Sequence, residues 1–283
     1  MRCWLPVMFE PVDQMVEIAR TAEACGYEGL ALADHVAIPE GFRSTHPSGE
    51  NPFTPDSAFP DPFVSIAAMA AATERLRFMS YVYVLPMRDP FAVAKQVGTV
   101  AAMFPGRVVF GVGAGWLTEE IELLGVDPTS RGRRMDEMLA VITDLWDDGW
   151  AEHHGDHFDF SRVGMFPVPS PRPRICVGGR SDAALRRAVR HDGWLGMNYE
   201  LDDIEQLVVR LHELRAEAAD ARADFEVFVI PNAVPTAELH DRLAGLGVTS
   251  TMVMPWYPGD PAAATLAAKR EAMEALATQL ALA

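Results

Sequence analysis

The sequence alternates between short apolar runs and longer amphipathic segments, and it does so eight times. Apolar runs include WLPVMF near the start, RVVFGVG in the middle and TSTMVMPWY near the end. Each run precedes a segment with apolar residues at helical spacing, such as QMVEIARTAEACG. Strands that are apolar on both faces are typical of parallel sheets, in which helices cover both sides.

Eight such units in 283 residues predict a (β/α)8 TIM barrel, with a doubly wound open sheet as the alternative. Residues 36–60, after the second strand, and 150–170, after the fourth helix, break the rhythm and are interpreted as insertions. No linker, repeat or low-complexity tract divides the chain. We therefore expect a single domain over residues 1–283.

Charge and hydropathy exclude several classes of function. The formal net charge is −16, whereas a nucleic-acid-binding face is basic. No apolar run reaches the roughly 18 residues of a membrane span, and the start lacks the pattern of a signal peptide. We expect no membrane contact and a cytoplasmic location. The triplet His153, His154 and His157 lacks the HExxH pattern, and the three cysteines are scattered, so we expect no metal.

The carboxyl ends of barrel strands carry the reacting groups in such folds. The second predicted strand ends in Asp34 and His35. Histidine exchanges a proton near neutral pH, so His35 is the candidate acid or base and Asp34 its candidate orienting partner. A structural histidine is the alternative interpretation.

Two glycine-rich strand ends are candidate ligand sites. In GVGAGW, residues 111–116, main chain without side chains can approach a flat or anionic ligand closely. Trp116 occupies the place of the third glycine in GxGxxG, so the dinucleotide fingerprint is not satisfied. In VGGRSD, residues 177–182, a strand end meets a helix start beside Arg180, which predicts a phosphate site. Ordinary tight turns are the alternative for both.

Several longer motifs together are similar to one known family. They are LADHVAIP, VYVLPMRDPFAVAKQVGTV, GRVVFGVGAGWLTEEIELLGV, RGRRMDEMLAVITDLW and RPRICVGGRSDAALRRAVRHDGWL. This combination resembles the bacterial luciferase-like monooxygenase superfamily, and most closely its branch that uses the deazaflavin coenzyme F-420. The resemblance covers nearly the whole chain. It implies a TIM barrel that binds a tricyclic ring at its carboxyl-terminal mouth.

The resemblance also implies roles for individual residues. His35 faces the reacting side of the ring, and a non-proline cis peptide near Val82-Tyr83 supports the ring from behind. The residues beside the ring and its ribityl chain are Gly113, Ala114 and Gly115. The residues that hold the phosphate are Gly178, Gly179, Arg180 and Ser181.

The implied function is hydride transfer between coenzyme F-420 (an 8-hydroxy-5-deazaflavin) and a small organic substrate. An FMN-dependent monooxygenase that uses reduced flavin and oxygen is the first alternative, and a non-catalytic flavin-binding protein is the second. The arginines Arg131, Arg133 and Arg134 form helical ion pairs or anchor the anionic tail of F-420, which favours F-420. The family often forms homodimers, and we expect one here.

Aromatic residues on loops and strand ends predict an apolar substrate pocket. The candidates are Trp116, Tyr199 and Trp256, with Phe42, Phe53, Phe59 and Tyr257 as further loop aromatics. Simple packing is the alternative interpretation, and the sequence does not identify the substrate.

Overall fold

The computed structural model describes residues 1–47, 49, 51, 53–218, 222–257 and 259–282. Within these residues, a parallel sheet closes on itself, because it runs in the order β3-β2-β1-β11-β10-β9-β8-β5-β4 and β3 also pairs with β5. Its strands are β1 (Arg2–Val7), β2 (Gly29–Leu32), β3 (Arg77–Ser80), β4 (Tyr83–Val84), β5 (Val108–Gly113), β8 (Arg174–Gly178), β9 (Gly193–Tyr199), β10 (Glu226–Pro231) and β11 (Ser250–Met252). We call each strand position of the barrel a stave. The strands β3 and β4 together form the third stave, so the barrel has eight staves. The TIM barrel is confirmed and the open sheet is wrong.

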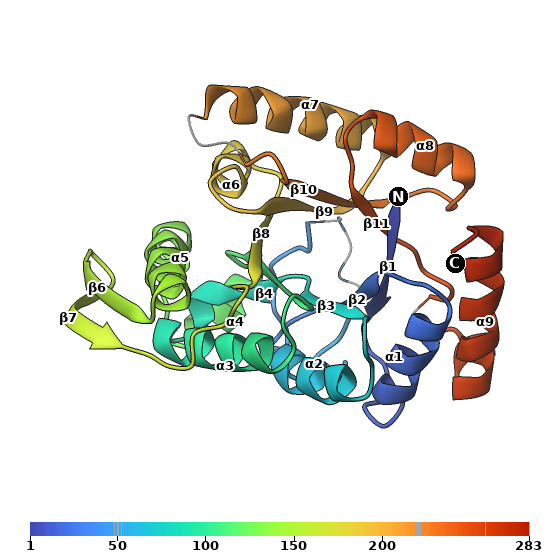
Figure 1. Ribbon diagram of the computed structural model, residues 1–283, viewed down its shortest axis with the longest axis horizontal. Helices are drawn as coiled ribbons and strands as arrows, with labels where there is room; N and C mark the ends of the chain where they lie inside the picture. Colours follow the sequence, from blue (N-terminus) through green and yellow to red (C-terminus); the bar gives the residue numbers. More distant parts are fainter. Residues whose placement is uncertain (48, 50, 52, 219–221, 258, 283) are drawn as a thin grey trace.

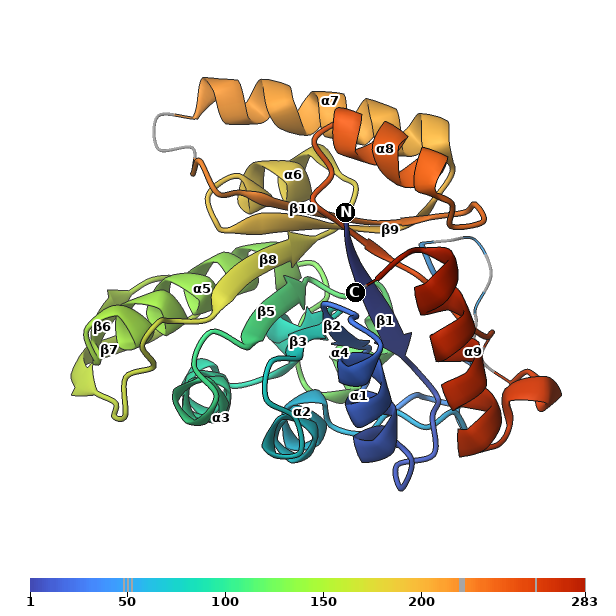
Figure 2. The same cartoon turned by 45° about the vertical axis from the view of Figure 1, so that its right-hand side comes forward.

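Helices surround the barrel, with α6, α7 and α8 on one side and α1, α2 and α3 on the opposite side (Figure 1, Figure 2). Their bounds are α1 (Met15–Ala24), α2 (Pro62–Ala71), α3 (Pro90–Met103), α4 (Thr118–Leu123), α5 (Arg131–Asp147), α6 (Asp182–Ala188), α7 (Leu201–Glu217), α8 (Ala237–Gly245) and α9 (Leu266–Gln279), with 3₁₀ turns at η1 (Leu85–Met87) and η2 (Pro261–Ala263). Local sequence fixes several starts. Asp61 and Asp89 cap α2 and α3 through their carboxylates, and each precedes a proline in the first turn. No helix in the described part of the chain is both long and apolar enough to cross a bilayer.

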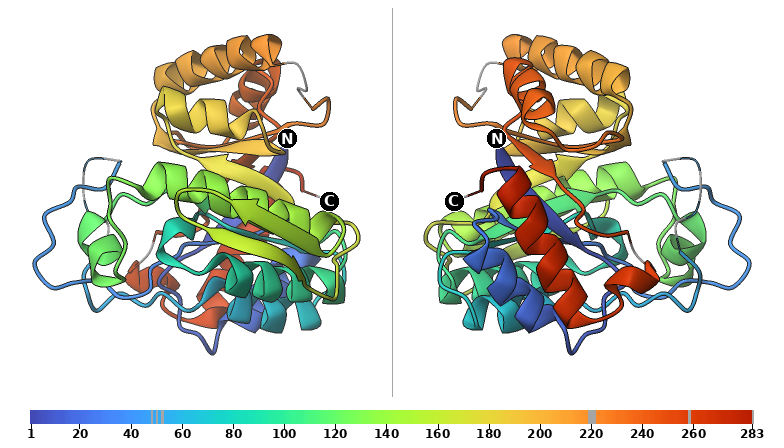
Figure 3. Two further views of the ribbon diagram at one scale, coloured as in Figure 1. Left: turned by 90° about the vertical axis from the view of Figure 1, so that its left-hand side faces the viewer. Right: turned by 90° about the vertical axis from the view of Figure 1, so that its right-hand side faces the viewer.

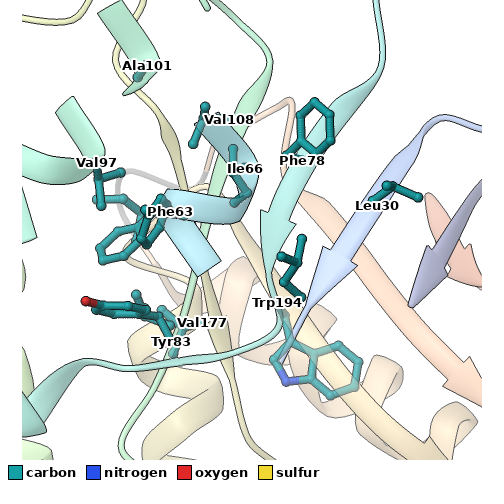
Figure 4. Close-up of a cluster of buried hydrophobic side chains, with 14 of the residues drawn as sticks. Leu30, Phe63, Ile66, Phe78, Tyr83, Val97, Ala101, Val108, Val177 and Trp194 are labelled. Carbon is teal, nitrogen blue, oxygen red and sulfur yellow. The ribbon is translucent and has the colours of Figure 1, made fainter. Parts of the chain in front are cut away.

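Two apolar layers hold the barrel together. The inner layer lies inside the strands, where Trp4 meets Phe228 edge to face with ring centroids 5.6 Å apart. The outer layer lies between strands and helices, and Figure 4 shows part of it around Phe63 and Phe78. Strand residues alternate between the two layers, which is why the strands read as continuous apolar runs. The three cysteines are free.

Neither predicted insertion contributes a strand to the barrel sheet in the described part of the chain. The first joins β2 to α2 and contains no regular helix or strand among its described residues; residues 48, 50 and 52 lie outside that description. The second contains an antiparallel hairpin of β6 (Trp150–His154) and β7 (Asp159–Gly164), which lies along the outer side of α5 (Figure 3). The Glu137 carboxylate on α5 accepts the backbone N–H groups of residues 156–158 at 3.0 Å.

The third stave breaks at a non-proline cis peptide bond between Tyr81 and Val82. This corrects the predicted position, Val82-Tyr83, by one residue. The physical reason is register: pairing with β2 ends at Ser80, and pairing with β5 resumes at Tyr83 opposite Val112. The hydrogen-bond ladder is therefore interrupted at Tyr81 and Val82. A motif match gives no strand register, so it could not locate this interruption to the residue.

Candidate active site

A cavity of about 310 Å³ lies at the carboxyl-terminal mouth of the barrel. Strand ends from β2, the third stave, β5 and β8 line it, together with the insertion after β2. It brings together most of the predicted site residues, namely Asp34, His35, Val82, Gly113, Ala114, Gly115, Trp116, Gly178, Gly179 and Ser181. The closure of the sheet causes this convergence, because all parallel strands end at the same rim.

His35 is held by Glu120, a residue that the sequence reasoning did not select. His35 Nδ1 lies 2.6 Å from Glu120 Oε2, and Glu120 Oε1 accepts the backbone N–H groups of Val36 at 2.5 Å and Ala37 at 3.1 Å. Burial acts to raise the pKa of Glu120, but the bonds from His35 and the two amides bring that pKa below its ordinary value. The carboxylate therefore accepts Nδ1–H, and Nε2 is the imidazole nitrogen left for a ligand.

Asp34 does not orient His35, which corrects the predicted pairing. Its carboxylate is bidentate with the Arg88 guanidinium, with both N–O distances at 2.7 Å, and it also accepts the Val84 N–H at 2.8 Å. Both residues follow the end of β2, where Asp34 bonds to the third stave and His35 bonds to α4. Asp34 instead ties the end of β2 to the third stave.

Val82 fills the space beside two of the predicted cofactor glycines. A Cβ added at Gly113 would lie 2.6 Å from Val82 Cγ2, and one added at Gly178 would lie 2.8 Å from Val82 Cγ1. The glycines of β5 and β8 thus accommodate the bulge of the third stave, in addition to lining the cavity. Ala114, between Gly113 and Gly115, also lines the cavity.

Aromatic side chains form one end of the cavity. We call His46, Phe53, Phe59 and Trp116 the aromatic wall. The His35 ring packs against the wall, with centroids 4.7 Å from Phe53 and 4.8 Å from Phe59, and the rings of His46 and Trp116 are 5.1 Å apart. Burial, and to a lesser extent His35, lower the pKa of His46 to about 4.

The remaining lining, which we call the polar end of the cavity, carries polar and cationic groups. Gly178, Gly179 and Ser181 line it after β8, and the Ser181 hydroxyl caps α6 by accepting the Ala184 N–H at 3.2 Å. Arg131, at the start of α5, lines it as well. A hydroxyl, backbone amides and a guanidinium form a suitable donor set for a phosphate group.

The sequence of the chain matches the model of a known family. The model of the luciferase-like monooxygenase domain matches residues 3–281. The chain belongs to the luciferase-like monooxygenase family. An uncharacterized protein of Mycobacterium tuberculosis is 38% identical over 241 residues, which cover 84% of this chain and 83% of the relative.

Relatives in the family are described with two different coenzymes. An FMNH(2)-dependent dimethylsulfone monooxygenase of Pseudomonas fluorescens is 26% identical over 211 residues, covering 74% of this chain and 53% of that protein. The crystal structure of a coenzyme F-420-dependent tetrahydromethanopterin reductase from Methanopyrus kandleri has a TM-score of 0.74 at 13% identity, covering 99% of this chain and 98% of the reductase. At that identity the likeness shows the fold alone, the TIM barrel.

Four predicted residues of this luciferase-like protein lie away from the cavity lining. Tyr83 is buried in the outer core beside Phe63 (Figure 4). Arg180 is exposed, and its guanidinium lies 5.3 Å above the ring of Tyr199, which is itself buried. Trp256 donates its indole N–H to Glu10 at 2.8 Å, and Lys269 of α9 donates to the same carboxylate. These residues do not line the cavity, and their assigned contacts with coenzyme or substrate stay predictions.

The histidines of the hairpin have local partners. His154 bonds to Asp159 at 2.5 Å and to Glu152 at 3.2 Å, and His153 stacks on Phe160. Among the residues that the structure describes, no three His, Cys, Asp or Glu side chains are grouped so that they could hold a metal ion.

The residues missed by sequence reasoning carried weak signals. Glu119 and Glu120 directly follow the glycine-rich strand end in the motif GWLTEE, so carboxylates at the rim of the fourth stave were visible. Their partners lie on the insertion after β2, more than 70 residues earlier in the chain. Only the closed barrel brings those two segments together.

Proposed function

We propose that the chain is an oxidoreductase that transfers a hydride between coenzyme F-420 and a small organic substrate. The observation that carries this proposal is the layout of the mouth cavity. A histidine fixed by a carboxylate lies at its apolar end, and a hydroxyl, amides and a guanidinium lie at its polar end. An elongated ligand with a flat ring and a phosphate tail matches this polarity.

The chain fits such a group at several points. Main chain without bulky side chains, at Gly113, Ala114 and Gly115, gives a flat ring close access to the end of β5. A Cβ on Gly179, which has φ +125°, would lie 2.8 Å from Ala184 Cβ, so only glycine lets this turn pack closely on the start of α6 beside the cavity. When bound, the coenzyme supplies two-electron hydride chemistry.

The protein's own residues orient the ligands and hold or accept one proton. Glu120 fixes the His35 ring, so Nε2 holds or accepts a proton at a defined place beside the aromatic wall. The wall excludes water from that place. Arg131 and Ser181 anchor the anionic tail, and the cationic side of this end favours the longer anionic tail of F-420 over FMN.

The test is a fluorescence titration of the purified protein with F-420 and, separately, with FMN. We expect F-420 to bind at least about tenfold more tightly than FMN, a difference of about 1.4 kcal/mol. Tighter binding of FMN would support the FMN-dependent monooxygenase instead, and binding of neither would refute both. Coenzyme binding without turnover in any redox assay would support the non-catalytic flavin-binding protein.

Arg131→Ala tests the polar end of the cavity. We expect it to weaken F-420 binding by about tenfold or more, because a charge-assisted contact to the anionic tail is lost. Arg133→Ala is the matched control, since Arg133 is exposed on the same helix and does not line the cavity. Equal affinity of both variants and the unmodified protein would contradict the assignment.

A further inference from the structure

The aromatic wall carries information about the second ligand of the cavity, the substrate. The wall comes almost entirely from the insertion after β2, whereas the coenzyme-facing glycines come from β5 and β8. Ring contacts continue behind it, with Phe9 and Phe59 centroids 5.1 Å apart. The substrate end is therefore built separately from the coenzyme end.

Two carboxylates on α4 hold the wall in place. Glu119 accepts the backbone N–H groups of Arg43 at 2.8 Å and Ser44 at 3.2 Å, and the Ser44 hydroxyl at 2.6 Å. Glu120 holds the start of the same insertion, as described above. The hydrogen bonds at Ser44 and Arg43 lower the pKa of Glu119 to about 2, so it remains ionised and bonded at neutral pH. The wall is consequently a prearranged surface.

No charged side chain that lines the cavity in the described structure lies free at the wall. The charged lining residues are Asp34, Arg131 and Arg187. Asp34 is paired with Arg88, and Arg187 is paired with Asp136 at 2.7 Å and 2.8 Å. Arg131 donates to the backbone oxygens of Gly115 and Pro128 and, under the proposed function, is occupied by the anionic tail of the coenzyme. His46, the remaining titratable group of the wall, is neutral at neutral pH because its pKa is lowered to about 4. A charged substrate group would lose its water here without gaining a counter-ion.

We propose that the aromatic wall selects a small, uncharged and largely apolar substrate that presents one oxygen atom to Nε2 of His35. The oxygen is a carbonyl or a hydroxyl, since either exchanges a hydrogen bond with an imidazole nitrogen. The substrate is small because a cavity of about 310 Å³ must also admit the coenzyme ring. Its role as a substrate and the occupation of Arg131 by the coenzyme tail rest on the proposed function.

The first experiment compares three cyclic ketones by ligand-observed NMR titration of the full chain, without and with F-420. The probes are cyclohexanone, methyl 4-oxocyclohexanecarboxylate and 4-oxocyclohexanecarboxylate. The last two differ by one methyl group and one negative charge. We expect the methyl ester to bind at least about tenfold more tightly than the carboxylate. Equal or tighter binding of the carboxylate overturns the proposal.

A charge introduced into the wall should reverse the preference. Phe59→Lys places an ammonium among the rings, and we expect it to tighten carboxylate binding by about tenfold or more. Val36→Lys is the matched control: it adds the same charge on the same insertion, where the side chain is 51% exposed. If both variants gain equally, the effect is one of net charge, and the proposal fails. If Phe59→Lys does not fold, His46→Lys makes the same test from the other side of the wall.

Different results would refute the proposed substrate class and the proposed coenzyme. F-420 fluorescence in the same samples reports coenzyme binding, whereas the titration without coenzyme reports the wall together with Arg131, which the coenzyme tail does not then occupy. Loss of coenzyme binding with an intact ester preference refutes only the coenzyme assignment. Coenzyme binding with no preference between ester and carboxylate refutes only the substrate class.

Discussion

At the scale of single residues, the site depends on which partner each titratable group has. Sequence proximity pairs His35 with Asp34, but the structure pairs His35 with Glu120 and Asp34 with Arg88. The two pairs have different tasks. The first presents Nε2 to the cavity, and the second joins β2 to the residues that follow the bulge. Glu120 bonds to His35 and to the backbone of Val36 and Ala37 but does not line the cavity, so it acts through His35 and is a positioning residue.

Glu120→Gln tests this role. An amide offers one oxygen where the carboxylate offers two, so it cannot accept both from His35 and from the amides of Val36 and Ala37. We expect turnover to fall by about tenfold to a hundredfold, with a changed pH profile and nearly unchanged coenzyme affinity. Glu122→Gln, exposed on the same helix, should behave like the unmodified protein. An unaltered pH profile in Glu120→Gln would argue against positioning.

At the scale of elements, the third stave determines the shape of the mouth. Its bulge at Tyr81 and Val82 directs the Val82 side chain between β5 and β8, and those strands have glycine where it arrives. The glycine content of the two strands and the break in the third stave are thus complementary features of one packing arrangement. Gly113 of β5 and Gly178 of β8 are explained only by the Val82 side chain that packs against them.

A double-mutant cycle measures this complementarity. Gly178→Ala should destabilise the fold by about 1–3 kcal/mol, because its methyl group meets Val82. Val82→Ala removes the clashing atom, so the double variant should lose less stability than the two single losses combined. Gly111→Ala is the control, since its Cβ would lie 2.0 Å from the backbone oxygen of Ser80, which Val82→Ala cannot relieve. Denaturant unfolding gives the values, and strict additivity for Gly178 would contradict the packing argument.

At the scale of the whole molecule, buried histidines make stability depend on pH. Burial, followed by the nearby Arg190, lowers the pKa of His191 to about 4, from an ordinary value of 6.5. The unfolded chain therefore takes up this proton at a higher pH than the folded chain does. The stabilisation is fully present above about pH 6.5 and is lost as the pH falls toward 4.

His191→Gln should flatten the fall in unfolding free energy between about pH 7 and pH 4.5, measured by denaturant unfolding. His154→Gln is the contrasting control. Hydrogen bonds from Asp159 and Glu152 raise the pKa of the exposed His154, so its small contribution is lost as the pH rises. A His191→Gln protein whose stability falls as steeply as that of the unmodified chain would refute the assignment.

The sequence by itself determined the barrel, the rim that carries the site, and the histidine and glycines on that rim. These follow from local information, because apolar periodicity gives the strands and helices, and parallel strands end at one rim. Only the tertiary structure decided the partners: Glu120 for His35, Arg88 for Asp34, and Val82 for the glycines of β5 and β8. Closure of the sheet sets strand register and brings distant segments together, and neither property is encoded in the pattern of any single segment.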